Sequence, residues 1–341
     1  MTLYRDVFKT AWKITKQNPA LWFFGLFAGP VINGGVFELL YQSLRLQRVN
    51  DGQWMNAAVE TVSRFNLIDS VSTLMGRIGT ITAEGRPSIL LLTVLGLGAL
   101  VLAWLIIISI DALISGTRHA LKNEFPTIRE GLKEGHTSFW SIAAVLVATV
   151  LLLSGLFLGI RASLTVPAQQ FVVTVPIALL ILAIMAVIAI VYFVAFYTIL
   201  FVVMKRLGLR AALSQTVALL KQYWLVNIEM SAVLYVIALA GGVIGTFLIQ
   251  LFAMLPLTYL LFSMAASGMF SPTVISVLGM LMDLLNNFLI LALWGIISVF
   301  TVNSWTLLFT QLTKKSGFES KTERVVKAVQ TLGSKPSNVL Q

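Results

Sequence analysis

The chain of 341 residues contains no cysteine, only two histidines and few charged residues. Without cysteine, neither disulfide bonds nor thiolate metal sites can form, and His119 and His136 alone leave little for histidine-based metal chemistry. We therefore expect no cofactor and no metal. Charged residues make up 11% of the chain, whereas soluble globular proteins carry about 25%. These absences exclude an ordinary soluble domain.

Apolar residues dominate instead, at 58% of the chain, with a mean hydropathy of +0.90. A soluble domain of this length could not bury so much apolar surface, so an integral membrane protein is predicted. The net charge of +10 would suggest nucleic acid only if the basic residues formed a patch on a soluble domain. They lie in short segments between apolar runs, which is the pattern that orients membrane proteins. We expect no nucleic-acid partner.

Six apolar runs are long enough to cross a bilayer core of about 30 Å, which requires roughly 20 residues. The first is interpreted as a retained span and not as a cleaved signal peptide, and Pro176 is expected to mark the start of the fourth. A single membrane domain over 1–312 is predicted, with an external amphipathic loop at 42–88 and a basic amphipathic cytosolic tail at 313–341. The spans are expected at 20–41, 89–115, 139–160, 177–203, 225–253 and 284–311.

The region 254–282 is ambiguous because its apolar character continues beyond the length of one span. It holds either an interfacial or re-entrant piece after Pro256, or an additional span. With six spans and a cytoplasmic N-terminus, 18 of the 24 lysines and arginines lie on the cytoplasmic side, including every lysine. A seventh span would move the six C-terminal basic residues outside, against the positive-inside rule. We therefore predict six spans in a bacterial inner (plasma) membrane, with both termini in the cytoplasm.

Amphipathic stretches precede the first, third and fifth spans. In the first, Tyr4, Val7, Phe8, Ala11 and Trp12 share one helical face while basic residues occupy the other, which is typical of a helix lying at the membrane surface. Similar spacing recurs at 125–139 and 209–220. Each stretch runs into a tryptophan suited to the headgroup level, and these anchors are Trp22, Trp140 and Trp224, with Trp12 inside the first stretch.

The predicted fold is therefore all-α: six transmembrane helices arranged as three hairpins, each preceded by a cytosolic amphipathic interfacial helix. Pairs of glycines four residues apart occur once in each odd-numbered span. Such pairs let helices approach closely, although they also arise by chance in apolar segments. The pairs are Gly25 and Gly29, Gly155 and Gly159, and Gly241 and Gly245.

Three stretches carry a resemblance to a known family: "FKTAWKITKQNPALWFFGLFAG", "IDALISGTRHALKNEFPTIREGLKEGHTSFWSIAAV" and "KRLGLRAALSQTVALLKQYWLVNI". Together they resemble the bacterial family named for the membrane domain of glycerophosphoryl diester phosphodiesterases. In fused members of that family the diester chemistry belongs to a separate soluble barrel, which this sequence does not contain. The resemblance therefore implies a membrane location and a six-helix architecture, and it does not imply diesterase activity.

Polar residues inside the predicted spans are candidates for function, because they are costly in a membrane. Asp111 and Glu229 are expected near the cytosolic ends of the second and fifth spans and could line a polar cavity or proton path with Asn227. Alternatively, each carboxylate reaches the interface or pairs with a cytosolic lysine or arginine. Asn286 and Asn287 are expected either to hydrogen-bond to neighbouring helices or to line a pore.

No catalytic motif is recognisable, so a non-enzymatic protein is expected. The leading hypothesis is a membrane scaffold or accessory protein that contacts anionic lipid headgroups and protein partners, or further copies of itself. The alternative is a transporter or channel for a small or lipid-like solute, with Asp111 and Glu229 in its path.

Overall fold

The computed structural model describes residues 2–32, 89–124, 127–164, 171–268 and 271–314. These residues fold into helices joined by short connections, and none of them forms a strand. The predicted loop at 42–88 and nearly all of the predicted tail lie outside the described residues. The helices are α1 (Thr2–Gln17), α2 (Pro19–Ile32), α6 (Ile89–Ala120), α7 (Ile128–Gly135), α8 (Phe139–Leu164), α9 (Phe171–Lys205), α10 (Leu209–Ile249), a π-helical turn (Gln250–Met254), α11 (Leu255–Ala266) and α12 (Pro272–Lys314).

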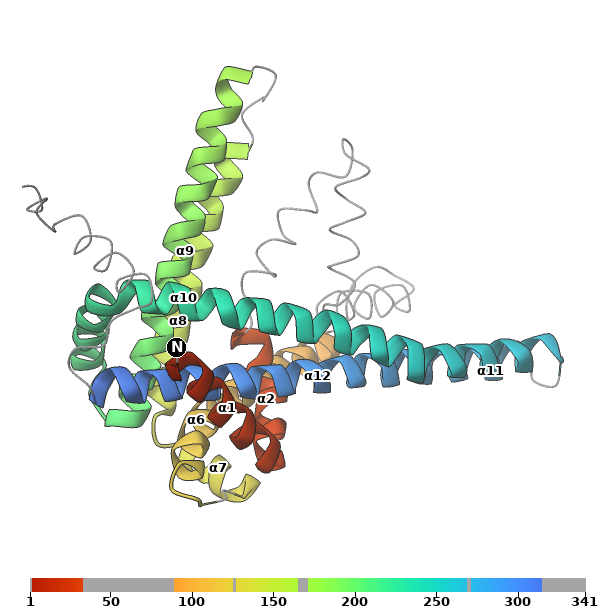
Figure 1. Ribbon diagram of the computed structural model, residues 1–341. Coiled ribbons are helices and arrows are strands. Elements are labelled where there is room, and N and C mark those ends of the chain that lie inside the picture. Colours follow the sequence, from red (N-terminus) through yellow and green to blue (C-terminus); the bar gives the residue numbers. More distant parts are fainter. Residues whose placement is uncertain (1, 33–88, 125–126, 165–170, 269–270, 315–341) are drawn as a thin grey trace, which may run out of the picture.

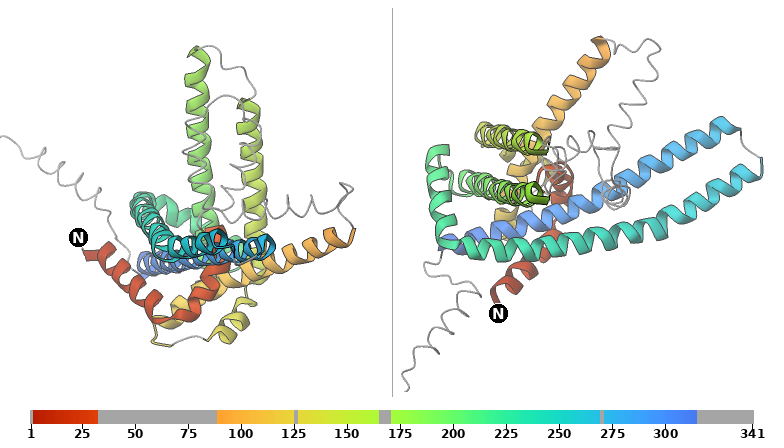
Figure 2. Two further views of the ribbon diagram at one scale, coloured as in Figure 1. Left: turned by 90° about the vertical axis from the view of Figure 1, so that its right-hand side faces the viewer. Right: turned by 90° about the horizontal axis from the view of Figure 1, so that it is seen from above.

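The helices form a hub from which three arms extend in different directions (Figures 1 and 2). The hub consists of α1, α2, α7 and the adjoining ends of the longer helices, and its core includes Phe24, Leu113, Leu200, Met230 and Leu308. One arm is the α8–α9 pair, the longest is α10 and α11 paired with α12, and the third is the outer part of α6. Buried apolar side chains are concentrated in the hub, whereas the arms expose theirs.

The first corner of the chain is the break between α1 and α2 at Asn18. Proline has no N–H and disfavours a helical conformation in the residue before it, so Pro19 ends α1 and begins α2. The side-chain amide of Asn18 donates to the Ile14 carbonyl at 2.8 Å. The indole Nε1 of Trp22 donates to the Thr15 carbonyl, also at 2.8 Å. The Ile14 carbonyl also accepts the backbone N–H of Asn18 at 3.1 Å, whereas the Thr15 carbonyl, whose helical donor would be residue 19, is bonded by the Trp22 side chain.

The second corner joins the short helix α7 to α8. Thr127 and Glu130 form a capping box at the start of α7, in which each side chain accepts a backbone N–H from the other residue. The chain turns at 136–138, and α8 begins at Phe139. The predicted amphipathic stretch at 125–139 thus contains a separate helix before the long one.

The third corner lies inside α10, where Tyr223 departs from helical geometry with φ −123° and ψ 28°. The amphipathic stretch at 209–220 is therefore a helical segment of its own, and a kink at Tyr223 separates it from the apolar helical segment that follows. Tyr223 is buried, so the bend occurs within the hub and not in solvent.

The region 254–282 is helical on both sides of a turn. α11 continues the path of α10 as far as Ala266, and α12 begins at Pro272. Pro256 lies in the first turn of α11, directly after the π-helical turn. A proline removes one helical hydrogen bond, and the wider π turn accommodates that loss without a reversal of the chain. The chain reverses between α11 and α12, where Gly268 has a positive φ of 66°, a conformation that glycine adopts readily. The helices thus extend beyond the predicted span ends at 253 and 284, and where the spans end in a membrane stays a prediction.

Five helical segments are long and apolar enough to cross a membrane: Gly96–Ala120, Phe139–Leu156, Ala186–Lys205, Leu209–Ala266 and Thr273–Lys314. A multi-pass membrane protein is therefore supported. The apolar segment Pro19–Gly29 is shorter, and the rest of the predicted first span lies outside the described residues. Pro176 does not begin a helix, because α9 already starts at Phe171 and proline is tolerated near a helix start.

Glycines bring α2 and α12 into close contact. A Cβ atom added to Gly25 would lie 2.4 Å from the Gly295 carbonyl oxygen, and one added to Gly29 would lie 2.8 Å from Ser298 Oγ. Gly245 lies equally close to Leu293 of α12. A Cβ at Gly241 would meet only Ile297, at 3.9 Å.

The glycines of α8 do not make such a contact where the structure describes their surroundings. A Cβ at Gly155 would meet nothing within 4 Å, and the surroundings of Gly159 lie outside the description. Of the predicted glycine pairs, those that approach a neighbouring helix closely thus lie on α2 and α10, against α12; outside these pairs, Gly135 of α7 lies equally close to Ile108 of α6.

Candidate functional site

Asp111 lies in the hub, on α6, and is 1% exposed. Its Oδ2 accepts a hydrogen bond from the backbone N–H of Ser138 at 3.3 Å. Ser138 immediately precedes α8, whose first N–H groups have no partners within the helix. A carboxylate at a helix N-terminus is also favoured by the helix dipole. Asp111 therefore holds the second corner by bonding the start of α8.

Asn227 lies one turn after the bend in α10 and is also 1% exposed. Its Nδ2 donates to the Tyr223 carbonyl at 3.0 Å, and its Oδ1 accepts a short hydrogen bond from the Tyr197 hydroxyl of α9. The amide thus bonds a carbonyl at the bend and joins α10 to α9. Asn227 therefore holds the third corner in the same way that Asp111 holds the second.

Glu229 faces a different helix, α1, and is half-buried. Its Oε2 accepts a hydrogen bond from the Tyr4 hydroxyl at 2.8 Å. The structure therefore does not bring the candidate residues of the predicted path together: Asp111 contacts the α7–α8 corner, Asn227 contacts α9, and Glu229 contacts α1.

Asn303 connects three helices at the centre of the hub. Its Nδ2 donates to Thr15 Oγ1 of α1 at 2.9 Å, and its Oδ1 accepts from Thr117 Oγ1 of α6 at 2.5 Å. All three side chains are at most 1% exposed. Because the Nδ2 group and the Oδ1 atom of this buried amide are both hydrogen-bonded, Asn303 fixes the register of α1, α6 and α12 against one another.

Asn286 and Asn287 lie far from the hub, on the longest arm. Asn286 Oδ1 accepts a hydrogen bond at 2.9 Å from the side chain of Gln250, which begins the π-helical turn. The hydrogen bond between Gln250 and Asn286 therefore links the end of α10 to α12. Gln250 lies 26 residues after Trp224, or about 39 Å along the helix at 1.5 Å per residue.

The predicted interfacial tryptophans are all partly exposed on the outside of the hub. Trp140 is 82% exposed, Trp224 59%, Trp12 56% and Trp22 38%. Trp22 also has a structural role, because its indole N–H donates to the Thr15 carbonyl at the end of α1. Tryptophan combines an apolar ring with one N–H donor, which suits both positions.

A polar cavity of about 400 Å³ lies between α2, α6 and α7. His119 at the end of α6 contacts two carboxylates there, with Nδ1 at 2.5 Å from Glu124 and Nε2 at 3.0 Å from Glu134 of α7. The hydrogen bond from His119 lowers the pKa of Glu124, and Lys122 and Arg118 act in the same direction. The backbone N–H of Thr127 likewise lowers the pKa of Glu130. The contact between His119 of α6 and Glu134 of α7 thus attaches α7 to the rest of the hub.

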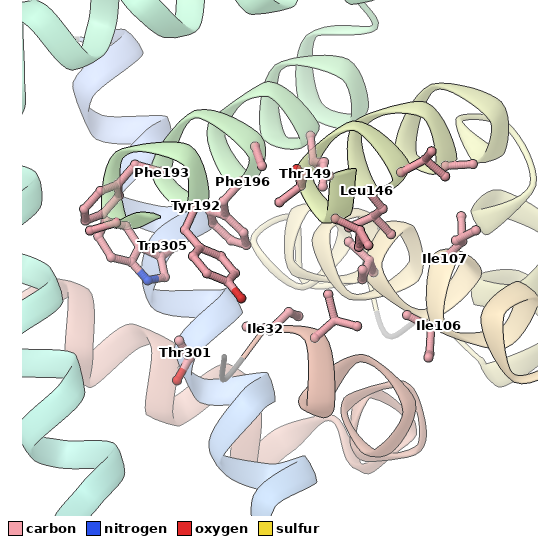
Figure 3. Close-up of a pocket in the computed structure, with 18 of the residues that line it drawn as sticks. Ile32, Ile106, Ile107, Leu146, Thr149, Tyr192, Phe193, Phe196, Thr301 and Trp305 are labelled. Carbon is pink, nitrogen blue, oxygen red and sulfur yellow. The ribbon is translucent and has the colours of Figure 1, made fainter. Parts of the chain in front are cut away.

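A larger, apolar cavity of about 830 Å³ lies at the root of the arms, between α2, α6, α8, α9, α10 and α12. Figure 3 shows Phe193, Phe196 and Trp305 along one side of it, with Leu146 and Ile106 on the other and the Tyr192 hydroxyl pointing into it. None of the described residues that line this cavity is charged.

Sequence reasoning missed the partners of the candidate residues. Tyr197 is one of two tyrosines in an apolar run, and Tyr4 was assigned to an apolar face. A tyrosine in such a run needs a partner for its hydroxyl when it is buried, which was the available signal. The apolar cavity left no signal, because its lining comes from helices far apart in the chain.

We predict that Asn227→Leu destabilises the protein by about 2 kcal/mol or more. The substitution removes the bonds to the Tyr223 carbonyl and the Tyr197 hydroxyl, and each buried polar group left without a partner costs about 1–3 kcal/mol. Reversible unfolding in detergent would measure this. Asn286→Leu is the matched control, because its amide bond on the exposed arm should contribute only about 0.6 kcal/mol. Equal losses in the two variants would contradict the role assigned to Asn227.

We also predict that α7 is held most firmly at mildly acidic pH. Glu124 and Glu130 have lowered pKa values in the folded state, so their contribution is present above the ordinary value of 4.5 and is lost as pH falls below it. On the alkaline side, only a charged imidazole carries two N–H groups, so a neutral His119 can donate to just one of its two carboxylates.

Amide exchange at 128–135, corrected for its intrinsic pH dependence, would test this prediction. Protection should fall between about pH 6 and 8, where histidine ordinarily changes charge. His119→Gln should abolish that fall. His136→Gln is the control, since His136 contacts the rings of Trp104 and Phe139; an equal effect of this control would show that His119 is not the responsible group.

Among the described residues, no group of three or more histidine, cysteine, aspartate or glutamate side chains is arranged to hold a metal ion. Comparison with protein-family models, with curated proteins and with solved structures finds no match to this chain.

Proposed function

We propose that this protein is a non-enzymatic membrane scaffold or accessory protein whose hub binds anionic lipid headgroups at the cytoplasmic surface. The observation that supports the proposal is the placement of basic side chains. Among the described residues, all of the lysines and arginines on the hub except half-buried Arg118 are exposed; they are Arg5, Lys9, Lys13, Lys16, Lys122, Arg129, Lys133, Lys205, Arg206, Arg210, Lys221 and Lys314. We call these twelve residues the basic collar.

The collar belongs to helices that meet the arms at corners. α1 and the first part of α10 each expose basic residues while burying apolar ones, such as Val7 and Ala11 of α1, and α7 exposes basic residues while burying its two glycines. The longest arm carries no lysine or arginine from Trp224 to Ala266 or from Pro272 to Thr313. Each basic residue close to an anionic leaflet contributes about 1 kcal/mol, so the collar favours an anionic surface over a neutral one.

In this proposal the three helix pairs cross the membrane as hairpins, and the basic residues of the hub lie at its cytoplasmic surface. The 43 residues of α12 extend about 65 Å, roughly twice the bilayer core. The polar pair of Gln250 and Asn286, about 39 Å from Trp224, fits the opposite interface. Helices cross bilayers with tilts of up to about 40°, so the arms draw closer together in the membrane than in Figures 1 and 2, turning at the three corners.

The alternative of a transporter finds less support. A polar path would need Asp111, Asn227 and Glu229 to share one cavity, and each instead bonds a different helix. The large cavity at the root of the arms is apolar, so of the two classes of solute considered it fits a lipid-like one and not a small polar one.

The absence of cysteine permits a direct test of the hairpin arrangement. We predict that a membrane-impermeant maleimide labels Lys9→Cys, Lys133→Cys and Lys221→Cys from the cytoplasmic side, and labels Ser271→Cys, in the turn of the longest arm, from the other side. Spheroplasts and inverted vesicles would supply the two orientations. Labelling of Ser271→Cys from the same side as Lys9→Cys would contradict a membrane crossing by this arm.

Lipid selectivity tests the function itself. We predict that the delipidated full chain retains phosphatidylglycerol in preference to phosphatidylcholine in native mass spectrometry. Replacing Arg5, Lys9, Lys13 and Lys16 with glutamine should reduce that preference, by up to about fivefold for each charge removed.

The matched control replaces four arginines predicted to lie on the other side, Arg45, Arg48, Arg64 and Arg77, with glutamine. This control should retain the native preference. Equal retention of the two lipids by the native chain, or an equal loss in both variants, would overturn the proposed role of the basic collar.

A further inference from the structure

We propose that the apolar cavity at the root of the arms binds an acyl chain of a membrane phospholipid. The proposal concerns a site inside the protein and a different part of the lipid from the headgroup. It rests on the membrane location alone and not on the basic collar, so the two proposals can fail separately.

The chemistry of the lining favours a hydrocarbon ligand. The hydroxyls of Thr149, Ser231 and Thr301 line the cavity, but each donates to a carbonyl of its own helix, at 2.7, 2.9 and 2.9 Å. These donors are therefore engaged before any ligand arrives. No charged side chain lines the cavity, so an ionised group placed there would lose its hydration without compensation.

The cavity is continuous with the outer apolar surface of the arms. Val147 and Leu151 of α8 and Tyr235 of α10 line it, and they are also 59%, 68% and 69% exposed. Both helices belong to segments apolar enough to cross a membrane. The opening between them therefore faces lipid chains, and a chain can enter sideways without passing through water.

The volume of about 830 Å³ requires an occupant. An apolar cavity of about 150 Å³ already accommodates a benzene molecule, and the walls of an empty cavity lack dispersion contacts on one side. A flexible chain can fill the space between Phe193, Phe196 and Trp305 and the aliphatic residues opposite (Figure 3). Lipid tails are as apolar as these walls, so an acyl chain that moves from the bilayer into the cavity gains no hydrophobic free energy. Shape and packing therefore hold the chain in place.

The experiment uses the full chain in phosphatidylcholine vesicles that contain a trace of a phospholipid with a diazirine near the end of one acyl chain. After illumination, mass spectrometry locates the crosslinks. We expect crosslinks at Phe193 and Trp305, which face the cavity, as well as at outward residues such as Phe252. Crosslinks confined to outward residues would overturn the proposal, and this result needs only the native chain.

Variants that fill the cavity provide the second arm of the test. Ala143 and Ala195 line the cavity, so Ala143→Phe combined with Ala195→Phe should lose most of the crosslinking to Trp305. The matched control combines Ala144→Phe with Ala186→Phe on the same two helices, at exposed positions outside the cavity. This control should retain native crosslinking.

Equal crosslinking of Trp305 in the filled variant and the control would overturn the proposal. If the filled variant fails to elute as a folded species, the native crosslinking pattern decides the question. Loss of the preference for phosphatidylglycerol with crosslinking intact would contradict the basic collar alone, since the cavity requires no anionic headgroup.

Discussion

The structure depends on one constraint: peptide groups that lose their helical partners at a corner must find others, because an unbonded polar group among apolar residues is costly. The chain turns at Asn18, at 136–138 and at Tyr223. At each turn a buried polar side chain bonds the backbone, namely Asn18, Asp111 and Asn227, and Trp22 bonds the Thr15 carbonyl that Pro19 leaves without its helical donor. These bonds hold the corners at which an apolar chain changes direction inside a packed hub.

This constraint changes the interpretation of the polar residues in the apolar segments. A carboxylate or amide in a span is usually examined first as part of a transport path. Here Asp111 and Asn227 bond the backbone, Asn303 joins α1, α6 and α12, and Glu229 accepts from Tyr4. Their bonds serve the hub, and the ligand site that we propose is the apolar cavity beside it.

The hub and the arms differ in what they bury. In the hub, residues such as Phe24, Leu113 and Tyr197 are almost completely covered by other helices. Along the arms, apolar side chains such as Val236 and Val243 remain exposed, at 62% and 60%, and a bilayer is the environment that suits them. The basic collar surrounds the hub and is absent from the long arm. Burial, exposed apolar surface and basic charge therefore all distinguish the hub from the long arm.

Much of the architecture could be predicted from local sequence. Composition required a membrane protein, and the amphipathic stretches located α1, α7 and the first part of α10 because helical periodicity is a local property. The corner at Pro19 was predictable for the same reason. The end of the fifth helix was not, because whether Pro256 breaks a helix depends on the π turn before it and on the partner helix α12.

The candidate residues likewise separate what local sequence predicts from what depends on other helices. Sequence by itself determined that Asp111, Asn227 and Glu229 were unusual, because a polar group among apolar neighbours is visible in one dimension. Only the tertiary structure decided what they bond, since Ser138, Tyr197 and Tyr4 come from other helices. The apolar cavity likewise exists only in three dimensions. Its walls are ordinary apolar residues of six helices, and their individual hydrophobicity carries no information about the space that they enclose.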